Sequence, residues 1–230
     1  MKFQHLLSAA FVCAAASPAA AATFNFGNLA TTVPAAFLTC SSTDRCSTTL
    51  GGSLSFTDIA SGIAVSAVGT YLGNPAATVQ DAPSGGPAGL GVYHAIRYPT
   101  IGNPVVSDTS DDNVSFGETL TLSFNQVVSL SSILFRNGDH GTSFAGNFGL
   151  SIDGGASVNQ LLVHNFNTPL QGQTFAFSGL DTPENTKFYV NALTVTAIPE
   201  PETYALMLAG LGAIGAWARR RRQEARTRRT

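Results

Sequence analysis

Two pairs of polar residues have the types and spacing that acid–base catalysis needs. An aspartate beside a histidine, as in Asp139-His140, can orient an imidazole as a general base, but the neighbouring glycines and asparagine are equally typical of a turn that ends a strand. Asp181 and Glu184 suit a carboxylate pair for glycoside cleavage, yet they flank Pro183 in a turn-forming stretch. The sequence contains no Gly-x-Ser-x-Gly, His-Glu-x-x-His or Walker-type glycine loop. We therefore predict no catalytic residue and no enzyme activity.

The densest cluster of oxygen ligands in the chain suggests metal binding instead. It contains Asp108, Asp111, Asp112, Asn113 and Glu118. Calcium takes about six to eight oxygen ligands, and an acidic loop that enters a strand can supply several of them. The order of these residues differs from that of an EF-hand, and an acidic solvated loop is the alternative interpretation. A structural calcium ion is the one cofactor that the sequence suggests, and we expect no other.

These candidates lie in a middle region, residues 23–198, whose short alternating runs are separated by turn-forming residues. In residues 119–124, leucine and phenylalanine alternate with threonine and serine, as expected for a strand with one buried face. We predict a single all-β domain, an antiparallel β-sandwich of jelly-roll type. Further strands are expected at residues 24–29, 53–57, 63–71, 132–136, 147–152, 158–163, 174–177 and 187–196.

Residues 73–113 are harder to assign, because three Gly-Pro-rich clusters interrupt them. We predict long loops here, with order only at residues 90–98. Loops at the end of a sandwich are where binding sites usually lie.

Charge is divided unequally along the chain. Seven of the twelve basic residues lie in the last twelve positions, whereas residues 23–198 carry eleven acidic residues against four basic ones. An acidic domain lacks the basic footprint that a nucleic acid would require. We therefore exclude nucleic acid as a partner.

The N-terminus has the pattern of a secretory signal peptide. Lys2 gives a positive start, residues 6–16 are an apolar run, and Ser17-Pro18 breaks it before a stretch of alanines. Signal peptidase needs small side chains at the −3 and −1 positions, which Ala20 and Ala22 supply. We predict that residues 1–22 are the signal peptide and that the mature domain is residues 23–198.

A second apolar segment lies near the C-terminus. Residues 204–218 carry no charge and are followed directly by Arg219, Arg220, Arg221 and Arg222. As a helix this segment covers roughly 22 Å, less than the roughly 30 Å of a hydrocarbon core. Snorkelling arginines and interfacial Trp217 would let it cross a locally thinned bilayer. We predict a transmembrane helix at 204–218 with the basic tail, residues 219–230, in the cytoplasm and the domain outside.

The motif Pro199-Glu200-Pro201-Glu202-Thr203 immediately precedes this segment. Its combination with an apolar helix, a basic tail and a signal peptide resembles the PEP-CTERM sorting signal, also known as the ice-binding-protein C-terminal segment. The resemblance covers about the last thirty residues. It implies recognition by an exosortase in the inner membrane of a Gram-negative bacterium, cleavage near Pro-Glu-Pro, and delivery to the cell surface or extracellular polymer. An ordinary single-pass anchor that is never cut is the alternative.

Export has a consequence for the cysteines. Removal of the signal peptide leaves only Cys40 and Cys46, six positions apart. The compartment outside the inner membrane is oxidising. We predict a Cys40–Cys46 disulfide, with two free thiols as the alternative.

The function expected from these observations is that of an exported surface or matrix protein. Signal peptidase and exosortase are its processing partners, and the inner membrane holds its precursor. We expect the mature domain to be a non-catalytic structural or polysaccharide-binding module, with exposed aromatic residues such as Tyr93 and Tyr98 as candidate sugar contacts. A secreted hydrolase acting on extracellular polymer is the alternative.

Overall fold

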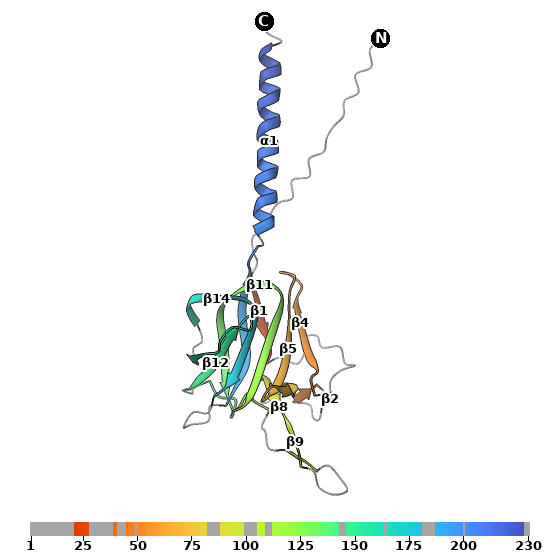
Figure 1. Ribbon diagram of the computed structural model, residues 1–230, viewed down its shortest axis with the longest axis vertical. Coiled ribbons are helices and arrows are strands. Elements are labelled where there is room, and N and C mark those ends of the chain that lie inside the picture. The colour runs from red at the N-terminus through yellow and green to blue at the C-terminus, as the bar shows by residue number, and fades with distance from the viewer. Residues whose placement is uncertain are drawn as a thin grey trace. The chain divides into compact units, whose positions relative to one another are not determined.

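The computed structural model (Figure 1) describes residues 21–27, 39–40, 45–48, 50–81, 88–98, 105–108, 112–142, 146–162, 165–180, 187–199 and 201–227. Contacts divide the chain into two units, and each is described by itself. One comprises Ala19–Ile198, and the other contains Pro199–Thr230. Of the predicted signal peptide only Ala21 and Ala22 lie within the described residues, so that assignment stays a prediction.

In the described part of the first unit the regular elements are all β-strands, which confirms the all-β prediction. The strands are β1 (Ala21–Asn25), β2 (Thr39–Cys40), β3 (Arg45–Ser47), β4 (Ser53–Asp58), β5 (Ile63–Tyr71), β6 (Asn74–Pro75), β7 (Ala77–Asp81), β8 (Gly89–Tyr93), β9 (Ala95–Tyr98), β10 (Val105–Asp108), β11 (Glu118–Asn137), β12 (Asn147–Ile152), β13 (Val158–Leu161), β14 (Asn165–Gly179) and β15 (Phe188–Ala197).

All the described strands except two belong to one antiparallel sheet. Its main path runs β13-β12-β14-β11-β15-β8-β7-β3-β2, while β1 pairs with β15, and β4, β5 and β6 form a branch attached to β11 through β5. β9 and β10 form a separate two-stranded sheet. In β4 and β5, buried and more exposed residues alternate, as expected for strands that pack one face on the core.

The 20-residue strand β11 explains why the described strands form one sheet and not the two separate sheets of the predicted jelly-roll sandwich. Residues 118–124 pair with β5, whereas residues 128–137 pair with β15. The register against β14 shifts between Ser123 and Val128, which is a β-bulge or an irregularity of the ladder. Bulges bend a strand and increase its twist. One strand thus belongs to both halves of the sheet and joins them.

The core shows that this sheet curls on itself. Phe26, which follows β1, meets Phe56 of β4 with ring centroids 4.9 Å apart, and Phe24 meets Phe124 of β11 at 6.3 Å. β1 is not a ladder neighbour of β4 or of β11, so these rings meet across the interior. A second aromatic group surrounds Phe135 and consists of Phe148, Phe177 and Phe188.

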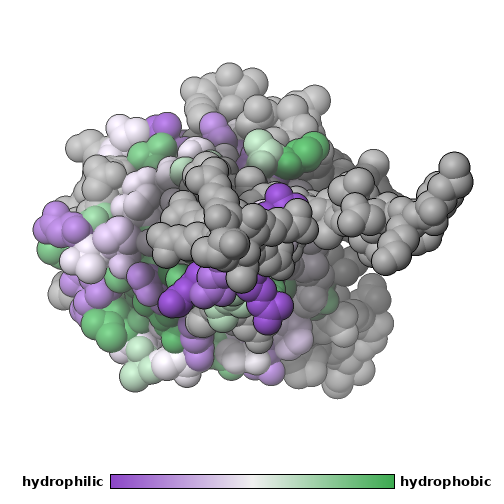
Figure 2. All heavy atoms as spheres, turned by 90° about the horizontal axis from the view of Figure 1, so that it is seen from above, coloured by the Kyte–Doolittle hydropathy of each residue, from purple (hydrophilic) through white to green (hydrophobic). Residues whose placement is uncertain are grey.

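One face of the structure carries a mixed surface. On the face seen in Figure 2, hydrophobic residues are interspersed among hydrophilic ones and do not gather in one patch. Single exposed apolar side chains of this kind are normal on soluble domains.

The prediction that residues 73–113 form long loops was wrong for much of that stretch. β7 and β8 pair as antiparallel neighbours and are almost entirely buried. The polar residues of β7 are satisfied internally: Thr78 Oγ1 accepts from the Gly69 amide at 2.8 Å, and Gln80 Nε2 donates to the Phe26 carbonyl at 2.9 Å. A strand buried on both faces lacks the alternation that reveals a strand in a sequence.

The second unit contains a single described helix, α1 (Pro201–Thr227). Proline suits the first turn of a helix, because its fixed φ matches the helix and its missing N–H would have no partner there. The helix includes the predicted segment 204–218 and continues through the arginines.

Candidate functional sites

The predicted sorting segment begins directly after the last strand. β15 ends at Ala197, and the Ile198 amide still donates a hydrogen bond to the Val127 carbonyl at 3.0 Å. Pro199, the next residue, is partly buried. The chain therefore stays attached to the sheet up to the residue before Pro-Glu-Pro.

The rest of the motif spans the start of α1. Glu200 lies outside the described residues, Pro201 is the first residue of the helix and Glu202 the second. An acidic residue in the first turn is favourable, since the N-terminus of a helix carries a partial positive charge. Pro-Glu-Pro-Glu is thus also a good local sequence for starting a helix. This property explains the position of the helix without reference to a protease.

The four predicted topology residues, Arg219, Arg220, Arg221 and Arg222, all lie within α1. The guanidinium of Arg221 stacks over the Trp217 ring one turn earlier, 4.3 Å from its centroid, as a cation–π contact. No helix in the described part of the chain combines the length and the apolar character that crossing a membrane requires.

The helix predicted at 204–218 is therefore present, but its assignment as a transmembrane span is not supported. The uncharged stretch, residues 203–218, has only sixteen residues, three of them glycine, and any longer stretch takes in Glu202 or the arginines.

A buried carboxylate lies at the start of β11. Glu118 is fully buried, and its Oε1 accepts from His94 Nδ1 at 2.7 Å. Its Oε2 accepts from the amide and the hydroxyl of Ser115, at 2.7 and 2.8 Å. Tyr71 of β5 stacks face to face on His94, with centroids 3.6 Å apart. We refer to His94, Glu118, Ser115 and Tyr71 as the buried dyad site.

Burial raises the pKa of Glu118, and the hydrogen bonds from His94 and Ser115 together with the charge of His94 act in the opposite direction. The cause is desolvation, which disfavours the charged carboxylate. Both carboxylate oxygens are used within the protein. The site thus joins β5, β11 and the residue between β8 and β9.

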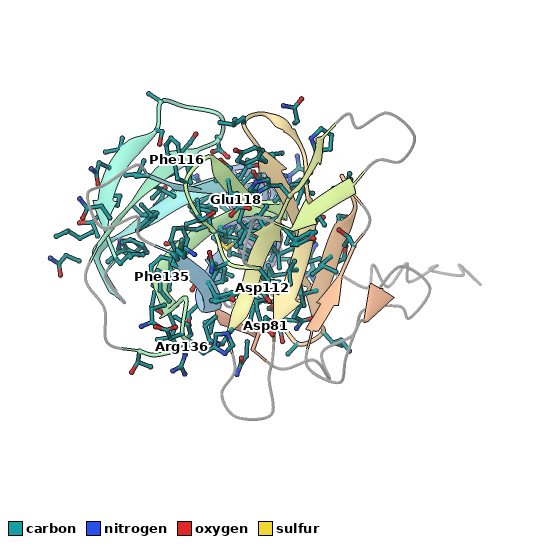
Figure 3. The ribbon with its side chains drawn as sticks, turned by 90° about the horizontal axis from the view of Figure 1, so that it is seen from below. Asp81, Asp112, Phe116, Glu118, Phe135 and Arg136 are labelled. Atoms are coloured by element: carbon teal, nitrogen blue, oxygen red, sulfur yellow. The ribbon has the colours of Figure 1, made fainter. Side chains whose placement is uncertain are left out.

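A second group of polar residues links β7, β15, the segment before β11 and the turn after it. His140 Nε2 lies 3.1 Å from Asp81 Oδ2, at the end of β7, and the His140 ring meets Tyr189 of β15 edge to face. The Tyr189 hydroxyl donates a short hydrogen bond to Asp112. Arg136 is the register partner of Tyr189. We refer to Asp81, Asp112, His140 and Tyr189 as the polar chain; Figure 3 labels Asp81 and Asp112.

The glycine at position 91 allows residues 112–113 to lie against β8. A Cβ on Gly91 of β8 would lie 1.8 Å from the Asp112 carbonyl oxygen, so any other residue would push residues 112–113 off β8. Beside it, Asn113 Oδ1 is buried, and within the described residues it has no hydrogen-bond partner; the same holds for Arg136 Nε.

The Asp139-His140 pair considered from the sequence is a turn, as the alternative interpretation held. The His140 amide donates to the Asn137 carbonyl at 2.9 Å, and the Asn137 amide donates to the Gly141 carbonyl at 3.0 Å. His140 has a φ of 64°, a left-handed conformation that is uncommon outside glycine and in which asparagine, aspartate and histidine are enriched. Its partner is Asp81 and not Asp139. Asp181 and Glu184 lie outside the described residues.

Two of the predicted calcium ligands have other partners within the protein. Asp112 accepts from Tyr189, and Glu118 is used by His94 and Ser115. In Figure 3 Glu118 lies apart from Asp112. Asp108 ends β10, and Asp111 lies outside the described residues. No group of three or more acidic, histidine or cysteine side chains suited to a metal occurs in the part of the chain that is described. Calcium binding stays a prediction.

The predicted disulfide partners face each other in the backbone ladder. β2 and β3 are antiparallel, and Cys40 is the register partner of Cys46. Residues directly opposite in such a pair have Cα atoms about 4.5 to 5.5 Å apart, within the range that a disulfide spans. The backbone is thus compatible with the bond, which itself stays a prediction.

Comparison with known proteins gives a match only at the C-terminus. No curated protein and no solved structure matches the chain. A family model for the PEP-CTERM protein-sorting motif matches residues 197–222, from the end of β15 through most of α1. This chain carries the PEP-CTERM protein-sorting motif at residues 197–222, and the motif supports an exported protein sorted by an exosortase.

Proposed function

We propose that the chain is made as a precursor held at the inner membrane, cut near Pro199-Glu200-Pro201 by an exosortase, and delivered to the cell surface or extracellular matrix as a non-catalytic module. The observation that carries the proposal is the sorting motif at residues 197–222. It begins where the β-domain ends, so a cut there releases the whole domain. Arg219, Arg220, Arg221 and Arg222 keep the tail on the cytoplasmic side, as cytoplasmic positive charge does in membrane proteins.

The proposed non-catalytic role is supported by the internal hydrogen bonds of three buried or partly buried carboxylates. Both oxygens of Glu118 accept hydrogen bonds inside the protein, Asp81 pairs with His140, and Asp112 accepts from Tyr189. A catalytic acid or base needs a free atom within hydrogen-bond reach of a substrate. We propose that these groups hold strands together and that the mature domain binds polysaccharide or contributes structure to the matrix.

Processing is tested by mass spectrometry of the extracellular form in an exosortase-bearing host and in the same host without the exosortase. We expect peptides containing Trp217 only in the second. Replacing Pro199, Glu200 and Pro201 together by alanine should retain the tail in the first host, whereas replacing Thr227 alone should not. Tail peptides in the purified wild-type surface form would contradict the proposal.

The ligand class is tested by cosedimentation of the purified mature protein with the host's own extracellular polysaccharide. Binding without release of new reducing ends is expected.

A secreted hydrolase is the second candidate, and the Asp81–His140 pair is the observation that favours it. His140 is partly exposed, with a side-chain exposure of 30%, and a carboxylate orients its ring. If it is a catalytic base, His140→Ala should abolish polymer cleavage by the mature protein. If the domain is a binding module, neither wild type nor His140→Ala releases reducing ends.

A further inference from the structure

The segment that an exosortase must cut is short and flanked by regular structure. Pairing in β15 continues to Ala197, the Ile198 amide bonds to Val127, and α1 begins at Pro201. A protease acts on chain that is locally open, and its rate follows the population of the open form when opening is fast. The residues just before Pro-Glu-Pro, up to Ile198, are therefore hydrogen-bonded to the sheet, whereas a protease would need them unpaired.

The end of β15 is held from both sides. Thr196 is the register partner of Ser129 on β11 and of Ala21 on β1, and the residue before it, Val195, is likewise shared between β11 and β1. Val195 is fully buried, and its β1 partner Ala22 is 1% exposed. Opening this end thus breaks two ladders and exposes part of the core.

We propose that residues 195–197, with their partners on β11 and β1, form a latch that limits access to the sorting segment, so that exosortase cleavage waits for this end of β15 to open. The latch rests on the proposed function, because it regulates the same cut. It needs no further ligand or enzyme. It acts through the fraction of molecules in which the last rungs of β15 are open.

The β1 half of the latch overlaps the predicted signal peptide. Ala21 and Ala22 precede the expected cut after Ala22, yet both belong to β1 and pair with Thr196 and Val195. A cut after Ala22 removes these two rungs, whereas a cut further upstream leaves them in place. The position of the N-terminal cut therefore sets how firmly the C-terminal site is held.

The first test locks the latch with a disulfide. Ser129→Cys with Thr196→Cys places two cysteines at directly opposed positions, whose Cα spacing of about 4.5 to 5.5 Å suits a disulfide. In pulse-chase experiments in exosortase-bearing cells, we expect tail loss to slow at least tenfold relative to wild type. Dithiothreitol in the medium should restore the rate, and Ser129→Cys alone should be processed like wild type.

The outcomes separate the two proposals. Tail loss at the wild-type rate in the oxidised double variant, with the tail retained in cells lacking the exosortase, overturns the latch and leaves the proposed function standing. A wild-type protein that keeps its tail in exosortase-bearing cells overturns the proposed function and the latch with it.

The second test varies the N-terminus. A heterologous signal peptide is fused so that cleavage leaves either Ala21 or Thr23 as the first residue, and the tail is followed as before. The form that begins at Thr23 should be processed several-fold faster. Val65→Ala, a core change on β5, a strand that carries no latch residue, controls for general loss of stability and should leave the rate unchanged. Equal rates for the two N-termini overturn the role of β1, and an equal acceleration by Val65→Ala overturns the latch as a local device.

Discussion

Removing the Glu118 carboxylate should be among the most damaging single changes in the domain. The side chain is fully buried and accepts three hydrogen bonds of 2.7 to 2.8 Å, one from His94 and two from Ser115. Glu118→Ala leaves these donors without a partner. Stranding a buried donor costs about 1 to 3 kcal/mol, and breaking a buried charged pair about 3 to 5 kcal/mol. Because Ser115 is only partly buried and can be rehydrated, we expect a total loss of about 3 to 5 kcal/mol.

The assay is guanidinium unfolding of the purified mature protein at neutral pH, followed by thermal melts. A domain of this size loses about 2 to 4 °C per kcal/mol, so Glu118→Ala should melt about 10 °C below wild type. Asp139→Ala is the matched control, because Asp139 is an exposed acid in a turn, and it should change stability by less than about 0.5 kcal/mol. Equal stability of wild type and Glu118→Ala would refute the structural role of the buried dyad site.

The pH dependence of stability gives an independent check on Glu118. Burial raises its pKa above the ordinary value of 4.5, so the folded state holds the proton more tightly than the unfolded state. The contribution of Glu118 to stability is therefore greatest below pH 4.5 and declines as the pH rises through the folded-state pKa. Glu118→Gln cannot ionise, and it should become less destabilising relative to wild type across this window. A difference between the two proteins that stays constant with pH would contradict the raised pKa.

Three further predictions concern other parts of the domain. Alkylation of the unreduced, denatured mature protein should find no free thiol, and Cys46→Ser should lower stability by about 2 kcal/mol through loss of the short loop closed with Cys40; two reactive thiols in the wild type would exclude the bond. If calcium binds, millimolar calcium should raise the melting temperature relative to chelator, and Asp111→Ala with Asp112→Ala should remove that shift, whereas coincident wild-type melts would mean a simple acidic loop. Phe135→Ala should cost about 3 to 5 kcal/mol in guanidinium unfolding, since it opens a cavity among three buried phenylalanine rings, and a loss below 1 kcal/mol would show that the rings repack.

The strands found from the sequence are those with a local period of two. Residues 119–124 alternate strictly, and the structure buries Leu120, Leu122 and Phe124 as predicted. β7 was missed because its polar residues are buried and satisfied by distant backbone groups. The single sheet was missed for a different reason: the alternation within β11 does not reveal that its two halves pair with different strands. Partner choice is a long-range property that one strand's sequence does not encode.

The candidate sites likewise differ in whether their residues are contiguous in the sequence. The sorting motif is contiguous and was identified directly. The contact between His94 and Glu118 joins the residue between β8 and β9 to the start of β11, and the Asp81–His140 contact brings the end of β7 to a turn beyond β11. The sequence holds one clue to the first that the predictions above did not use: Glu118 has the same parity as Leu120, Leu122 and Phe124, the buried residues of its strand. The sequence contains no comparable indication for His140, whose orientation depends on its turn.

The pairing of β1 with β15 also has a consequence for secretion. Thr23 and Thr194, whose hydroxyls lie 3.2 Å apart, are separated by 171 residues in the chain. During translocation the N-terminal strand emerges first, and it must wait outside the membrane without its partner until nearly the entire domain has crossed. Contacts of such long sequence separation form late and slowly. The domain therefore completes its fold only once β15 is available to pair with β1, and until then β1 lacks its ladder partner.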